Sequence, residues 1–275
     1  MQRPHDSQEQ APRLRSSTLR KFLAACAAVA VLLLLALGTW QVFRLQWKLD
    51  LMEKVDTRVH AKPVAVPEPA RWAQVTASND EYRHVTLTGV YLPEYTTRVQ
   101  ATTDLGSGYW LMTPLCVQSS HIVIINRGYI GQEAARRMPA SATLSAATSA
   151  GKAVCATVAG RPAVTITGLL RMPETGRAFL RHNDPANHRW YARDVAAIAL
   201  ARGFDGAMVA PFFVDTDKGQ EPPAEDEALR PVGGLTVISF TNNHLVYALT
   251  WYALAAMAAG AFIWVARDDK RRQAK

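Results

Sequence analysis

A histidine and a tryptophan open the last apolar run of the chain, in the stretch TNNHLVYALTWY. On a helix, seven residues advance about 10 Å and nearly two turns, so His244 and Trp251 lie on one face. Ala248, Ala255 and Ala258 fall on the same face, and small side chains leave a shallow slot for a neighbouring helix or a flat macrocycle. A neutral imidazole at the edge of a bilayer is a competent axial ligand for haem iron. The alternative is an interfacial histidine that is bonded to lipid or water.

A basic side chain stands at the outer end of the first apolar run. Arg44 comes one turn after Trp40, at the level expected for His244 if both runs cross a membrane. An arginine can bind a carboxylate through two parallel hydrogen bonds, so Arg44 is a candidate partner of a haem propionate. The alternative is a side chain that simply extends to the membrane surface. The first run contains neither histidine nor methionine, so no second axial ligand is predicted.

Signatures of soluble enzymes are missing from the sequence. It has no GxSxG elbow, no phosphate-binding glycine loop, no HExxH and no CxxC. The seven histidines are scattered, and no two have ligand spacing on one predicted element. Cys116 and Cys155 could pair in an oxidising compartment, but two unpaired thiols are an equally open interpretation.

Two further polar clusters interrupt the middle of the chain. We interpret NRG at 126–128 as a turn that ends a strand. In HNDPANHRWYARD at 182–194, Asp194 or Asn187 is expected to cap the helix that follows. The alternative is that this second segment forms a surface on which a partner docks.

Two long apolar runs predict two transmembrane helices, 22–43 and 245–266, each without a charged residue. At about 1.5 Å per residue, each can cross a hydrocarbon core of roughly 30 Å. The alternative for the first run is a cleaved signal peptide, with ALG at 36–38 as its cleavage site. The run is long for a signal peptide, and the sequence after it continues as a helix, with Trp47, Leu51, Val55 and Val59 forming one stripe.

The basic charge of the chain lies in its tails. Residues 1–21 hold five basic and two acidic side chains, 267–275 hold the same, and only 21 basic against 19 acidic remain between them. By the positive-inside rule both tails are cytoplasmic, and residues 44–240 form an extracytoplasmic domain. A nucleic-acid partner is not expected, because a basic footprint should gather on the folded domain.

The extracytoplasmic domain has the pattern of an α+β fold with a mostly antiparallel sheet or open barrel. Alternating or β-branched runs predict strands, and ARDVAAIALARGF predicts one helix at 192–204 that Gly203 closes. A small-residue insert at 131–160 has no usable period and is predicted to be a mobile loop. The predicted strands are 84–92, 96–103, 108–117, 121–130, 163–172, 208–216 and 235–240.

The order of several motifs between the two apolar runs resembles a known family. The motifs are LGTWQVFRLQWKLDL at 37–51, NRGYI at 126–130, GLLRMPE at 168–174, NDPANHRWYARDVAAIA at 183–199, PVGGLT at 231–236 and NNHLVYALTWY at 242–252. Together they resemble the Surfeit-locus family of cytochrome c oxidase assembly factors, of the bacterial type. The family's histidine and tryptophan at the second span fall on His244 and Trp251. Tyr129 departs from the pattern, since many members have tryptophan there.

The resemblance implies a membrane-bound assembly factor rather than an enzyme. It implies transient binding of haem a, with His244 as axial iron ligand and Trp251 beside it, and delivery of haem a to oxidase subunit I. Further partners would be a haem a synthase and membrane lipid. The expected location is the bacterial inner membrane, and the alternative is the mitochondrial inner membrane. The rival functions are a membrane scaffold for oxidase subunits that never binds haem, and a haem-modifying or redox enzyme.

Overall fold

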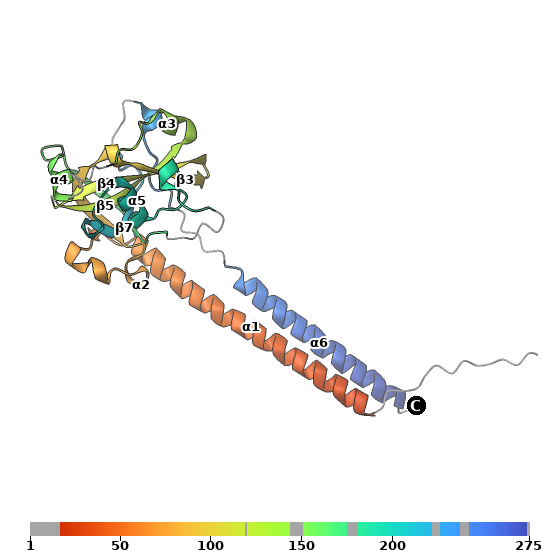
Figure 1. The fold of residues 1–275 in the computed structure, drawn as a ribbon. Coiled ribbons are helices and arrows are strands. Elements are labelled where there is room, and N and C mark those ends of the chain that lie inside the picture. The colour runs from red at the N-terminus through yellow and green to blue at the C-terminus, as the bar shows by residue number, and fades with distance from the viewer. Residues whose placement is uncertain are drawn as a thin grey trace, which may run out of the picture. The chain divides into compact units, whose positions relative to one another are not determined.

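The protein forms two compact units, residues 1–53 with 239–275 and residues 54–238. Figure 1 shows the order of their helices and strands along the chain in the computed structural model. The structure describes residues 17–118, 120–143, 151–174, 181–221, 226–236 and 242–273.

The first unit is a pair of long helices, α1 at Ser17–Val59 and α6 at His244–Gln273, and α1 runs on into the second unit. Both are long and apolar enough to cross a membrane, over Lys21–Val59 and His244–Asp268. The predicted spans 22–43 and 245–266 lie within them. Large apolar side chains such as Leu32, Phe43 and Trp264 are exposed, as expected of helices that face lipid.

The two helices run antiparallel and side by side (Figure 1). Their contact is close because Gly38 has no side chain: a Cβ there would lie 2.8 Å from the ring of Tyr252. The Tyr252 hydroxyl lies 3.1 Å from Thr39 Oγ1, and that threonine also donates to the carbonyl of Leu35. Since the one hydroxyl proton of Thr39 is used within its own helix, Tyr252 donates across the pair. This contact fixes the register of α6 against α1.

The second unit is built on a seven-stranded sheet that closes into a small barrel. The strand order is β1-β2-β6-β7-β5-β4-β3, and an additional pairing of β2 with β4 closes a ring of five strands. Pairing is antiparallel except between β5 and β7 and between β1 and β2. The strands are β1 Val64–Ala65, β2 His84–Tyr91, β3 Thr97–Thr103, β4 Gly106–Val117, β5 His121–Gly131, β6 Val164–Arg171 and β7 Val209–Thr216. The mostly antiparallel character is as predicted.

The core lies on both faces of the sheet. Successive residues of a strand point to opposite faces, so the adjacent Phe212 and Phe213 enter two different apolar clusters, both fully buried. Helix α5, Val195–Arg202, covers one face through Ile198 and Ala199. It ends at Gly203 with φ 79°, as the sequence predicted, because glycine adopts the left-handed conformation without strain.

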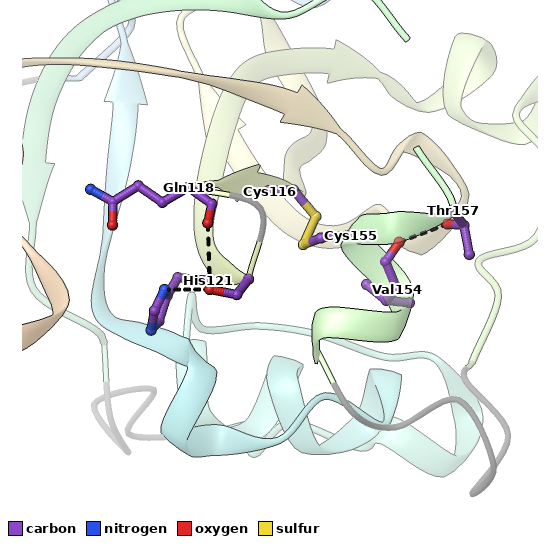
Figure 2. Close-up of a disulfide and its surroundings, with 7 residues drawn as sticks. Cys116, Gln118, His121, Val154, Cys155 and Thr157 are labelled. Carbon is purple, nitrogen blue, oxygen red and sulfur yellow. Dashed lines mark hydrogen bonds between the residues drawn. A yellow bond between two sulfur atoms is a disulfide. The ribbon is translucent and has the colours of Figure 1, made fainter. Parts of the chain in front are cut away.

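The insert at 131–160 contains regular structure, and its predicted mobility stays a prediction. Its described residues contain α3 at Gln132–Arg137 and α4 at Gly151–Ala156. A disulfide joins Cys155 of α4 to Cys116 near the end of β4, and both cysteines are buried (Figure 2). Ala-rich composition hid these elements, because apolar alanine runs carry little periodic signal. The other described helix, α2 at Ala77–Asp80, was also not predicted.

The NRG sequence is not a turn, contrary to expectation. Strand β5 continues through it, with a register shift that places 126–129 opposite 110–112 of β4. Gly128 has φ 124°, and a Cβ there would lie 2.4 Å from the backbone of Val232. Tyr129 and Val232 exchange two backbone hydrogen bonds at this point. The bulge in β5 therefore pairs with the segment that precedes α6 in the sequence. The predicted strand at 235–240 falls mainly outside the described residues.

Candidate functional site

His244 is the first residue of α6 and faces α1. Its Nδ1 lies 2.7 Å from Oε1 of Gln41, and the side chain is half-buried. An amide oxygen only accepts hydrogen bonds, so with the amide in this orientation Nδ1 is the donor. Nε2 makes no hydrogen bond to any described residue. In a neutral ring that donates from Nδ1, the lone pair lies on Nε2, and this is the form of imidazole that binds a metal.

The face of α6 that carries His244, Ala248, Trp251 and Ala255 packs against α1. Ala248 and Ala255 are 2% and 1% exposed, while Trp251 is half-buried. In a unit of two helices, only the neighbouring helix can bury a helical alanine so completely. Of the two occupants considered for the slot, the described structure contains the helix.

Arg44 lies three residues beyond Gln41 on α1 and is exposed. Its guanidinium carbon lies 4.0 Å from the centroid of the Trp47 ring, a cation–π contact within the helix. Among the described residues Arg44 makes no ion pair. The structure therefore shows a cation that is free to bind an anion, and its role beside a propionate stays a prediction.

These residues fit a haem group in one respect and not in another. The Nε2 atom of His244, held in orientation through Nδ1, is a suitable axial donor, and Arg44 follows one turn after Gln41. The slot behind His244 is filled by α1, so a macrocycle would approach from the edge of the helix pair. No group of three or more His, Cys, Asp or Glu side chains in the described part of the chain could hold a separate metal ion.

The barrel contains a buried polar cluster centred on Asp215 of β7. Its carboxylate is 3% exposed and accepts hydrogen bonds from four side chains. The donors are Asn126 at 2.8 Å, Arg171 at 3.1 Å, Arg193 at 3.2 Å and Thr236 at 2.8 Å. They come from β5, from β6, from the segment before α5 and from the segment after the 3₁₀ helix Glu227–Leu229, so Asp215 joins four parts of the chain.

Two more carboxylates belong to this cluster. Arg171 also binds Glu81 at 3.3 Å, and Arg193 also binds Glu174 through Nε at 3.2 Å. Burial opposes ionisation of Glu174, but its hydrogen bonds to Arg193 hold the pKa of that carboxyl below its usual value. Burial likewise opposes the charge on Arg193, but Asp215 and Glu174 raise the pKa of the guanidinium above its usual value. Both groups remain ionised, so the cluster is a set of salt bridges that holds the barrel together.

Four of the sequence motifs meet at this cluster. NRGYI supplies Asn126, GLLRMPE supplies Arg171 and Glu174, the segment NDPANHRWYARD supplies Arg193, and PVGGLT supplies Thr236. The motifs are far apart in the sequence, and nothing in their spacing showed that they share one acceptor. The cluster explains them as parts of one structural centre.

The segment at 182–194 also caps two helices. Asp194 accepts from the backbone N–H of Ala197 at 3.1 Å and caps α5, as predicted. Asn187 is not a cap, contrary to the alternative; instead Asp184 caps the short 3₁₀ helix Pro185–Asn187. Docking of a partner on this segment stays a prediction.

Sequence reasoning missed Gln41 and Asp215. Gln41 lies within the motif at the end of the first predicted span, where a polar side chain in an apolar helix usually has an internal partner. Asp215 lies in MVAPFFVDT near the end of a predicted strand, and no local pattern marks it as a buried acceptor.

Comparison with known proteins gives consistent matches over most of the chain. A family model described as the SURF1 family matches residues 28–256, which include Gln41, Arg44, His244 and Trp251. Surfeit locus protein 1 of Mus musculus is 30% identical over 271 residues, covering 93% of this chain and 77% of the mouse protein. The Xenopus tropicalis protein of the same name is 29% identical over 264 residues, covering 90% and 75%. A SURF1-like protein of Monosiga brevicollis is 28% identical over 249 residues, covering 86% and 84%.

Proposed function

The chain belongs to the SURF1 family, and from that premise we propose that it is a membrane-anchored assembly factor for haem–copper oxidase of the cytochrome c type. In this proposal it binds haem a transiently and supports its insertion into subunit I. Transfer of an intact cofactor requires binding and release rather than bond chemistry, so we propose that the protein is not an enzyme.

The observation that carries the haem proposal is the contact between His244 and Gln41. Nδ1 of the ring lies 2.7 Å from Oε1 of Gln41 within a pair of apolar helices, so Nε2 is the ring nitrogen left to bind a ligand. When bound, haem would supply an iron centre for that nitrogen. Trp251 would give the site an aromatic wall, and Arg44 would bind a propionate, so Arg44→Gln is expected to lower haem occupancy.

Purification of the protein from cells that also make haem a tests this function. We expect the full-length chain to carry a Soret band and to release haem a on pigment extraction. A colourless protein on which oxidase assembly still depends would support the membrane scaffold, which the helix packing over Ala248 and Ala255 also favours. Turnover of haem or quinone by the purified protein would support an enzyme.

We further propose that residues 54–238 lie outside the cytoplasm, in a bacterial inner membrane protein with both termini inside. The Cys116–Cys155 disulfide supports this, because such bonds persist in oxidising compartments. In the chain-entropy description, a bridge across 39 residues contributes about 4 kcal/mol to stability. The basic tails support the same orientation.

A reporter that is active only in the periplasm tests the orientation. Fused after Lys275 it should remain silent, and inserted within residues 140–150 it should be active. Because Cys116 and Cys155 are buried, the disulfide is checked in a denatured Cys26→Ser variant: a maleimide should label both cysteines after reduction and few thiols without it. A mature chain that begins near Thr39 would contradict the model of two spans and indicate signal-peptide cleavage.

A further inference from the structure

We infer that Gln41 is the positioning residue of the site: it determines which ring nitrogen of His244 is free to bind a ligand. This inference rests on the proposed function, because it assigns a role toward the same histidine. Gln41 would not touch the iron and acts only through the ring that does.

The chemistry of the two side chains gives the direction of the hydrogen bond. The distance between Gln41 Oε1 and His244 Nδ1 is 2.7 Å. Because an amide oxygen has no proton to give, the bond exists only when Nδ1 carries the ring hydrogen. The other tautomer would require the amide to turn and donate from its NH2 group to Nδ1. In the orientation that the structure shows, Oε1 faces Nδ1, and Gln41 holds the tautomer with its lone pair on Nε2.

The surrounding helix contacts keep Gln41 opposite His244. Gly38 admits the ring of Tyr252, and Tyr252 donates to Thr39, two residues before Gln41. His244 is also anchored at the start of α6, where its backbone N–H donates to the Asn242 side chain at 3.4 Å. The glutamine and the histidine are thus presented by two helices whose register is independently fixed.

The neutral charge of the amide has a consequence for binding strength. A carboxylate that accepts from Nδ1 raises the basicity of a metal-binding imidazole, whereas a neutral amide orients the ring with less increase. An oriented but moderately basic donor suits a site that must release its ligand. Replacing Gln41 by glutamate should therefore strengthen donation from Nε2 and stabilise the ferric form relative to the ferrous form.

The tautomer can be measured without haem. In full-length protein carrying ¹⁵N-labelled histidine at about pH 8, where histidine is largely neutral, NMR distinguishes the protonated from the unprotonated ring nitrogen. The His244 signals are assigned by their absence in His244→Ala. Wild-type protein should show Nδ1–H, and Gln41→Met, which removes the acceptor at similar size, should show a mixture of tautomers. Gln46→Met, an exposed glutamine on the same helix, should match wild type.

Haem titration tests the same inference in a second way. Titrated with ferric haem, Gln41→Met should bind about 10- to 100-fold more weakly than wild type, and Gln41→Glu should retain affinity with a lower midpoint potential. If wild type binds no haem, the proposed function fails, while the NMR result still decides the tautomer. If wild type binds through His244 but Gln41→Met has the same tautomer, affinity and spectrum, only the inference about Gln41 is overturned.

Discussion

Of the substitutions that we propose, Asp215→Ala should be the most destabilising to the unit of residues 54–238. The change removes the shared acceptor of Arg171 and Arg193 and leaves two largely buried guanidinium groups with an incomplete set of partners. Glu81 and Glu174 would still pair with the two guanidinium groups, but four donors would lose their shared acceptor. A buried donor left unsatisfied costs about 1–3 kcal/mol, so we expect a total loss of about 3–5 kcal/mol. For a unit of this size that corresponds to a fall in Tm of roughly 10 °C. Thermal unfolding of the detergent-purified, full-length protein measures it.

Two companion variants separate the charge of Asp215 from its volume. Asp215→Asn keeps the size of the side chain but removes the negative charge, so it should be nearly as destabilising as alanine. Asp56→Ala removes a carboxylate from an exposed pair with His60, where both side chains are 74% exposed, and should change stability by less than about 1 kcal/mol. If both Asp215 variants unfold at the wild-type temperature, the cluster does not hold the barrel together.

The sequence predicted those parts of the fold that local patterns determine. Six of the seven predicted strands correspond to β2 to β7 within a few residues, because alternation along a strand reports directly which face is buried. The cap at Asp194 and the end of α5 at Gly203 were also readable, since each depends on one residue type at one position. Closure of the barrel by β2 and β4 was not readable, because it depends on a pairing with no local signal.

The candidate site was predictable in part for the same reason. His244 was identified because a histidine at the mouth of an apolar helix is chemically unusual. Its partner Gln41 lies 203 residues away in sequence, and only the packing of α1 against α6 brings the two together. The bulge at Gly128 was missed because its cause, the backbone of Val232, also lies far along the chain.

His244→Ala should abolish most haem binding without unfolding the protein. Insertion of α6 depends on its apolar residues, so loss of one interfacial imidazole should leave the protein level unchanged. The iron would lose its axial nitrogen, and haem occupancy should fall roughly tenfold or more, since each 1.4 kcal/mol of lost binding is a factor of ten. The pigment that remains would be held by contact with the Trp251 ring and not by an iron–nitrogen bond, so its Soret band should move.

Trp251→Ala provides the matched comparison on the same helix face. It removes an aromatic wall rather than a ligand, so its haem occupancy should lie between those of wild type and His244→Ala. Its Soret position should stay near that of wild type, because the iron–nitrogen bond is kept.

The ratio of haem a to protein in purified His244→Ala, with its visible spectrum, tests the central claim most directly. The protein should be produced beside wild type in cells that make haem a, and both should be purified at equal yield. We predict a strongly reduced ratio and a displaced Soret band in the variant. An unchanged ratio with an unchanged spectrum would contradict the ligand role of His244 and favour the scaffold that binds no haem through this residue.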